Sequence, residues 1–174
     1  MNGGFLVLDL ATQLGWAEGI PGEKPAYGTH RLAPEGSEPM AIFGGMIDFL
    51  GRRLQAFRYK MVVYEAPLDP RFMGPRTNLN TARMLLGLPA IVEGVCYQCG
   101  VYNLREASVN DVRDHLLGYR PKKKEGKAHV MAHLRSLGYE PQDDNAGDAL
   151  ALWLYSASIF DSRVGAKTTR LFSQ

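Results

Sequence analysis

The sequence predicts one α/β domain, spanning residues 1–160, with a central mixed sheet of five strands flanked by helices. Two apolar runs, 5–8 and 61–64, each lead directly into an acidic residue and have the continuity of strands that are buried on both faces of a sheet. Apolar residues between 40 and 57 recur every three or four positions, which indicates a helix able to cover such a sheet. A chain of 174 residues with 45% apolar composition can bury a core of this size.

The first strand ends at Asp9, within the segment FLVLDLATQLGW. A small, polar turn that contains glycine follows it. An ionised carboxylate inside or just beyond a central strand is costly to desolvate unless a cation or several donors compensate it. A metal ion would do so, and an Asp that caps the neighbouring turn is the alternative. The segment alone leaves both interpretations open.

Two short strands, Leu14–Gly19 and Tyr27–Leu32, are expected next, because the prolines and glycine of IPGEKP force a turn between them. With the first strand they predict an antiparallel meander. The amphipathic helix that follows has Ser37 as a plausible N-cap and Pro39 in its first turn, where proline is tolerated.

The strand Met61–Tyr64 repeats the design of the first strand and ends in Glu65. If the two strands are neighbours, about 4.8 Å apart, their terminal carboxylates can converge on one ion. The loop 66–76 then carries prolines, two arginines and the apolar Phe72. A loop of this kind beside an acidic site is a candidate for substrate contact, unless Phe72 folds back onto the core.

Two helices are expected between residues 77 and 97, the first capped by Thr77 or Asn78 and the second beginning after Pro89. Few charges lie between 82 and 100, so the sheet or another subunit must cover these helices. A short strand, Val101–Leu104, is expected after them.

The cysteines, Cys96 and Cys99, form a CxxC pair near the end of an apolar helix. Free, partly buried thiols are favoured over a redox pair, or over a zinc site shared with His129 and His133. The two histidines lack the intervening Glu of an HExxH motif and are interpreted as surface residues.

A basic segment precedes the last helix. Ser108 begins a capping box with Asp111, in a helix that is expected to end at Gly118. Between 113 and 135 there are seven Lys or Arg residues and two acids. This concentration fits a surface for phosphate contacts, and a solvated helix face would have the same composition.

The closing helix begins in the sequence DDNAGDALALWLY. Asp143, Asp144 or Asn145 can cap it, and its small residues allow close approach to a sheet. Asp144 and Asp148 are four positions apart and share one face, which Asn145 borders. Capping does not explain Asp148, which lies among apolar residues inside the helix and is the third carboxylate in need of a cation. Residues 161–174 are expected to form a flexible basic tail.

The chain resembles the RuvC family of Holliday junction resolvases, a branch of the RNase H-like nucleases, in three segments taken in order. These are LVLDLATQLGWA, VVYEAP and DDNAGDALALWLY. The basic segment before the last helix is also similar to that family. The resemblance implies an RNase H-like fold and a crossover junction endodeoxyribonuclease activity.

Carried onto this sequence, the resemblance implies that Asp9, Glu65 and Asp148 are metal ligands. Many family members have an acid or a histidine three residues before the final Asp, where this chain has Asn145. Asn145 can ligate a metal through its carbonyl oxygen without adding charge, and Asp144 can take over from the adjacent position. The implied catalytic set is Asp9, Glu65, Asp144, Asp148 and Lys127. The resemblance implies DNA contacts by Phe72, Arg113 and Lys127. The other predicted nucleic-acid-binding residues are Arg76, Arg120, Lys122, Lys123 and Lys124.

The expected cofactor is Mg²⁺, two ions in each active site, with Mn²⁺ able to substitute. Phosphodiester hydrolysis by two metals needs such a carboxylate cluster to hold both hard cations. The resemblance implies branched DNA, a four-way junction, as the partner, and a homodimer, because two symmetric cuts need two active sites. We place that interface on the helices between 77 and 100. No nucleotide cofactor or membrane span is expected, and the expected location is the cytoplasm of a bacterial or phage-infected cell.

Other functions remain open. An RNase H-fold nuclease could act on another branched DNA or on an RNA/DNA hybrid. Asn145 also raises the possibility of a catalytically inactive module that binds junctions. Sugar kinases and actin-like ATPases open with a similar strand and Asp, but they need two such lobes, for which 174 residues leave no room.

Overall fold

The computed structural model describes residues 3–67, 79–122 and 125–161. Its strands are β1 (Gly4–Asp9), β2 (Gln13–Gly19), β3 (Ala26–Arg31), β4 (Tyr59–Glu65) and β5 (Leu104–Ala107). Its helices are α1 (Pro39–Ala56), α2 (Leu79–Gln98), α3 (Val109–Leu117), α4 (Gly126–Ser136) and α5 (Asp144–Phe160). None of the helices in these ranges is long and apolar enough to cross a membrane.

The strands form one mixed sheet in the order β3-β2-β1-β4-β5, which confirms the predicted fold class. β1, β2 and β3 are paired antiparallel, as the predicted meander requires. β4 pairs in parallel with β1 on one side and with β5 on the other. β1 and β4 are therefore neighbours whose carboxyl ends lie at the same edge of the sheet.

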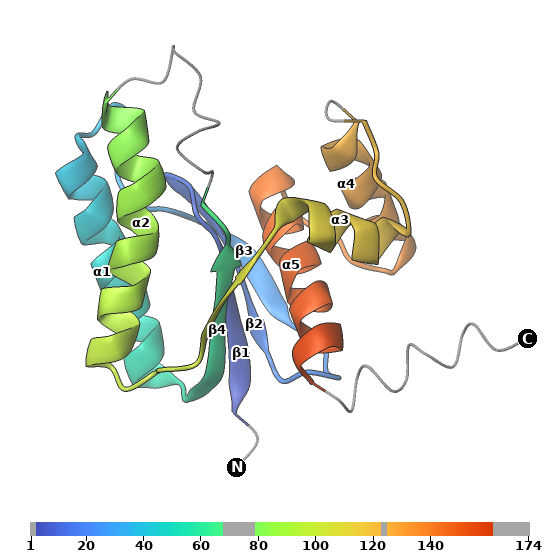
Figure 1. Ribbon diagram of the computed structural model, residues 1–174, viewed down its shortest axis with the longest axis horizontal. Helices are drawn as coiled ribbons and strands as arrows, with labels where there is room; N and C mark the ends of the chain where they lie inside the picture. The colour runs from blue at the N-terminus through green and yellow to red at the C-terminus, as the bar shows by residue number, and fades with distance from the viewer. Residues whose placement is uncertain (1–2, 68–78, 123–124, 162–174) are drawn as a thin grey trace, which may run out of the picture.

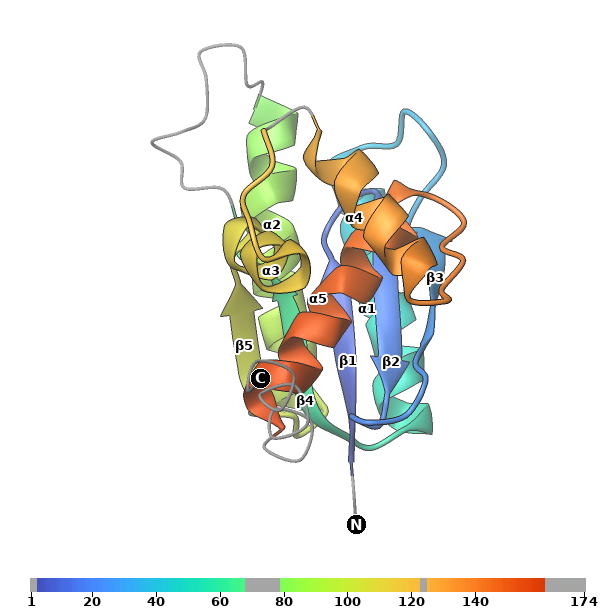
Figure 2. The same cartoon turned by 90° about the vertical axis from the view of Figure 1, so that its right-hand side faces the viewer.

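Helices cover both faces of the sheet, α1 and α2 on one side and α3, α4 and α5 on the other (Figure 1). In Figure 2, α5 crosses the face of the sheet diagonally, below α3 and α4. Alternate residues of β1 enter the two cores: Leu6 and Leu8 pack with α1 and α2, whereas Phe5 and Val7 pack with α5. Burial on both faces explains why this strand is apolar throughout.

Two predicted helix boundaries are wrong. Ser37 does not cap α1, because Glu38 precedes the first residue, Pro39, and gives no side-chain cap. Nor does Pro89 separate two helices, since α2 runs through it without interruption. Proline removes one backbone hydrogen bond, and burial of Leu88, Pro89 and Val92 in the core offsets that loss.

The fifth strand begins at Leu104 and not, as predicted, at Val101. Gly100 is left-handed, with φ of 76°, and the Val101 amide donates to the Cys96 carbonyl at 2.9 Å. Val101 therefore still belongs to the turn that ends α2. Pairing with β4 starts only where the Val62 amide donates to the Asn103 carbonyl.

Both predicted ends of α3 are confirmed. The Ser108 hydroxyl caps α3 by accepting from the Asn110 amide at 3.2 Å, and left-handed Gly118 ends that helix. Thr77 and Asn78, the predicted caps of α2, lie outside the described residues, as does the predicted tail after Asp161.

Candidate active site

Asp9 and Glu65 end the adjacent parallel strands β1 and β4. Leu8 is in register with Tyr64, so the next residue of each strand lies beside the other at the carboxyl edge of the sheet. The two carboxyl groups are close enough that each affects the pKa of the other. The expectation that the two strands are neighbours is thus confirmed, and their terminal carboxyl groups lie close together.

Gly15 lets helix α5 approach these acids. It is paired with Asp9 across β1 and β2. A Cβ atom at this position would lie 2.1 Å from the carbonyl oxygen of Asn145 and 3.2 Å from the Cβ of Ala149. The first turn of α5 therefore rests directly on the β2 backbone. This close contact brings Asp148, one turn further along α5, to the side of Asp9 and Glu65.

Asp143 fixes the start of α5. One carboxylate oxygen accepts from the Ala146 amide at 2.9 Å, and the other accepts from the Thr29 hydroxyl of β3 at 3.2 Å. The cap is thus tied to the edge of the sheet. Asp144, the first helical residue, has a side chain that is 57% exposed and free of the capping role.

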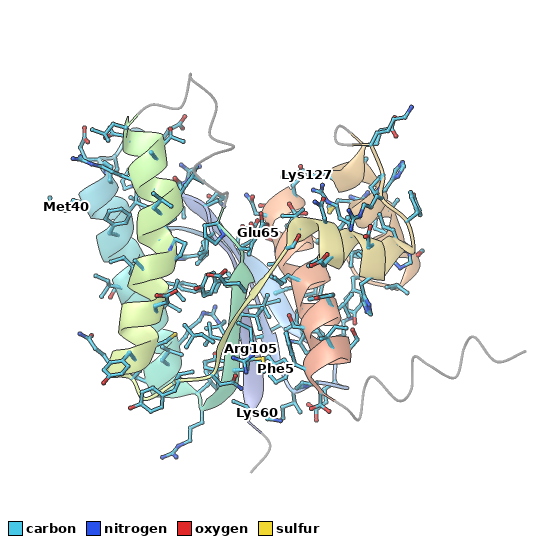
Figure 3. The ribbon with its side chains drawn as sticks, in the orientation of Figure 1. Phe5, Met40, Lys60, Glu65, Arg105 and Lys127 are labelled. Carbon is cyan, nitrogen blue, oxygen red and sulfur yellow. The ribbon has the colours of Figure 1, made fainter. Side chains whose placement is uncertain are left out.

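Two cations stand beside the carboxylates. The ammonium group of Lys127, at the start of α4, lies 3.3 Å from an Asp148 oxygen and 3.9 Å from an Asp144 oxygen. Figure 3 shows Lys127 and Glu65 at the same end of the sheet. Arg113 of α3 lines a small cavity together with Glu65 and Asp148. Its guanidinium packs against Gly126, where a Cβ atom would lie 3.0 Å away.

Burial and mutual repulsion disfavour ionisation of these acids. Burial raises the pKa of Asp9 to about 8, and the charges of Glu65 and Asp148 add to the effect. Burial, then the charge of Asp148, also raises the pKa of Glu65. The pKa of Asp148 is raised by burial as well, and Lys127 and Arg113 oppose that rise. Full ionisation of the three acids would therefore place more negative charge in this buried cluster than Lys127 and Arg113 offset.

This donor set fits a hard divalent cation. Carboxylate oxygens are the ligands that Mg²⁺ prefers, and a cation would lower the cost of ionising the buried acids. Within residues 3–67, 79–122 and 125–161, no three acidic, His or Cys side chains stand close enough together to hold an ion as they are placed. Asp148 is instead paired with Lys127. The acids lie close together, but their described side chains do not form a complete set of metal ligands.

Other predicted residues lie elsewhere or outside the described ranges. Arg120 pairs with Asp114 at 2.5 Å on the surface, and Lys122 is exposed before α4. His129 contacts the Tyr119 hydroxyl at 2.9 Å, whereas Cys96 and Cys99 are free thiols, the first buried and the second exposed. The predicted DNA contacts outside the described residues are Phe72, Arg76, Lys123 and Lys124.

Sequence reasoning missed three residues that position the site. Thr29 anchors the α5 cap, Gly15 admits the first turn of α5, and Gly126 makes room for the Arg113 guanidinium. The two glycines stand in segments without a distinctive motif, and only the tertiary contacts identify their role. A Thr on an edge strand likewise carries no signal in the sequence.

Comparison with known proteins places the fold among the Holliday junction resolvases. RuvC of Thermus thermophilus in complex with a Holliday junction substrate superposes with a TM-score of 0.68 and 21% identity, covering 94% of this chain and 96% of that chain. A second structure of that RuvC gives a TM-score of 0.63 and 22% identity, covering 93% and 96%. The yeast mitochondrial Holliday junction resolvase Ydc2 gives a TM-score of 0.62 and 11% identity, covering 95% and 83%.

No family model matches the sequence, and no curated protein matches it. The similarity therefore lies in the structures, over nearly the whole chain and at low sequence identity. It confirms that the chain has the RNase H-like fold of RuvC, as the three sequence segments imply.

Proposed function

We propose that this protein is a metal-dependent, structure-selective endonuclease that cleaves four-way DNA junctions. The observation that carries the proposal is the convergence of Asp9, Glu65 and Asp148, from two strands and a helix, at the carboxyl edge of a RuvC-type sheet. The similarity to a RuvC structure that contains a Holliday junction substrate supports the choice of DNA substrate.

The acids would hold two Mg²⁺ ions, or Mn²⁺ in their place. Asp9, Glu65 and Asp148 are the proposed ligands, with Asp144 or Asn145 as the fourth. When bound, the ions supply an activated water and stabilise the charge that develops on the leaving oxygen. The carboxylate oxygens of the ionised acids would be the metal ligands, and the packing of α5 on Gly15 limits the movement of Asp148.

The cations would bind the phosphate backbone around this centre. Arg113 and Lys127 lie beside the carboxylates, and Arg120 and Lys122, exposed in the segment between α3 and α4, would add further phosphate contacts. Contacts of this kind give affinity without reading bases. Selectivity for a junction would then come from the shape of the DNA and the spacing of two active sites.

A homodimer would provide the two active sites that paired cuts require. Large apolar side chains are exposed on the helices opposite the candidate site: Met40 and Ile47 on α1, Leu79 and Leu86 on α2. Met40, which Figure 3 shows on the outer side of α1, also lines a hollow with Ile47 and Arg83. We place the dimer interface on this face. The mass measured by light scattering should therefore be that of two chains, and Leu86→Glu should reduce it to one.

A cleavage assay tests the proposal. A labelled synthetic four-way junction is incubated with the wild-type protein in Mg²⁺ or Mn²⁺, beside a linear duplex and an RNA/DNA hybrid. Glu65→Gln should abolish cleavage of the junction, whereas Glu35→Gln, on an exposed loop, should not change it. Cleavage of the hybrid in preference to the junction would show a different nuclease.

A second candidate is a junction-binding module without activity. The observations that favour it are Asn145, in place of an acid or a histidine, and the lack of a three-ligand cage among the described side chains. This module would bind the junction with an affinity that divalent metal does not change, and it would leave the DNA intact in both metals.

A further inference from the structure

Lys127 forms ion pairs with two of the candidate metal ligands, Asp148 and Asp144. We propose that it couples DNA binding to metal binding: its ammonium group neutralises Asp148 and Asp144 in the free protein and moves to a DNA phosphate in the complex, which releases both carboxylates for the metal. This inference rests on the proposed function, because it concerns the same site.

The contacts of Lys127 place its charge where it competes with a metal. Its ammonium lies 3.3 Å from Asp148 and 3.9 Å from Asp144, one turn apart on α5. The Asp148 side chain is only 20% exposed, so few water molecules reach it to weaken this attraction. A divalent ion that binds Asp148 must therefore displace, or bind against, a cation that is already present.

Lys127 is also free to move. It belongs to α4 and not to α5, so no helical repeat holds it beside the two acids. Its side chain is 52% exposed, and the ammonium group is carried on a flexible stem of four carbons. A DNA phosphate that approaches Lys127 offers its ammonium group an alternative anion with the same charge as a carboxylate.

Arg113, a second cation at the site within the described residues, is not arranged in this way. Its guanidinium is packed against the backbone of Gly126, and Arg113 lines one cavity with Glu65 and Asp148. A fixed Arg113 offsets the charge of the acids whether or not DNA is bound. The exchange of partners is therefore assigned to Lys127 alone.

Linkage gives the proposal a quantitative form. If DNA raises the affinity for metal by some factor, metal must raise the affinity for DNA by the same factor. Replacing Lys127 by an uncharged residue should tighten metal binding in the free protein and should remove most of the coupling. We expect about a tenfold change in the metal dissociation constant, equivalent to about 1.4 kcal/mol.

The experiment measures metal binding without relying on cleavage. Mn²⁺ is titrated into the DNA-free protein and followed by electron paramagnetic resonance, for the wild type, Lys127→Met, Lys127→Gln and Lys60→Met. Lys60→Met removes the same charge and serves as the matched control, because Lys60 lies at the opposite end of the sheet from Glu65 and Lys127 (Figure 3). Circular dichroism verifies that each variant is folded.

Both Lys127 variants should bind Mn²⁺ about tenfold more tightly than the wild type, and Lys60→Met should bind as the wild type does. In a second arm, fluorescence anisotropy measures junction affinity with and without Ca²⁺, and a denaturing gel verifies that the DNA stays intact. Ca²⁺ should strengthen junction binding by the wild type about tenfold and by the Lys127 variants much less.

Equal or weaker Mn²⁺ binding by both Lys127 variants would overturn the inference, while metal-dependent cleavage by the wild type would leave the proposed function intact. A wild type that binds no Mn²⁺ and never cuts the junction would overturn both. The two failures are therefore distinguishable.

Discussion

Gly15→Ala tests whether the close packing of α5 on the β2 backbone determines the cleavage activity. The added Cβ atom would lie 2.1 Å from the Asn145 carbonyl oxygen and 2.7 Å from its carbonyl carbon. Ordinary contacts of this kind are about 3.4 Å or longer, so the first turn of α5 has to move by about 1 Å. Neither partner is the end of a flexible side chain, because both belong to backbone.

Two effects should follow from this displacement. Overpacking of a close backbone contact costs roughly 1–3 kcal/mol of stability. A shift of about 1 Å in Asp148 relative to Asp9 should also reduce the cleavage rate by about 10²-fold. The loss of activity should exceed what the unfolded fraction explains, because the variant remains mostly folded at 25 °C.

The assay compares single-turnover junction cleavage with the midpoint of thermal unfolding. Gly51→Ala, in α1, is the matched control, since a Cβ atom there meets nothing within 4 Å. It should stabilise the helix by about 0.5–1 kcal/mol and leave the rate unchanged. A Gly15→Ala protein with the wild-type rate and wild-type Mn²⁺ affinity would refute the reasoning.

Three further predictions concern the cap, the buried acid and the basic surface. Asp143→Ala removes the acceptors for the Ala146 amide and the Thr29 hydroxyl. The free energy of unfolding, measured in urea, should therefore fall by about 1–2 kcal/mol. The exposed substitution Glu35→Gln should cause no such loss. Burial raises the pKa of Asp9 from 3.8 to about 8, so the folded protein keeps a proton that the unfolded chain releases. In EDTA, the free energy of unfolding of the wild type relative to Asp9→Asn should therefore fall as the pH rises from about 4 to about 8, by roughly a few kcal/mol, and level off above that; a difference that does not vary with pH would contradict the burial of this acid. Arg120→Ala breaks an exposed ion pair with Asp114 and should leave the unfolding midpoint unchanged. It should weaken junction binding and reduce the slope of log affinity against log salt concentration by about 1. An unaltered slope would show that Arg120 does not contact the DNA.

Sequence patterns predicted the parts of the site that depend on local chemistry. The continuous runs that end in Asp9 and Glu65 identified two buried strands, and the acids follow directly from the strand ends. Asp148 stood out because capping could not explain a carboxylate inside an apolar helix. The sequence left the cap of α5 open between Asp143, Asp144 and Asn145, and the structure assigns it to Asp143.

The rest depends on contacts between distant segments. The span through Pro89 was misread because the burial that sustains α2 comes from the tertiary core, which a local rule cannot include. The left-handed turn at Gly100 makes β5 begin later than predicted, and the strand propensities of the following residues do not indicate this turn. The pairing of Lys127 with Asp148 joins two helices, so the charge run alone could not separate a phosphate surface from a solvated face.

The most direct test of the central claim is strand-resolved mapping of the cuts in a four-way junction. Each strand is labelled in turn and incubated with Mg²⁺ and either the wild type or Asp148→Asn. The account predicts paired nicks, symmetric about the crossover, that the variant does not make and that a linear duplex does not receive. A junction that stays intact in Mg²⁺ and in Mn²⁺, or one that Asp148→Asn cuts as fast as the wild type, would contradict it.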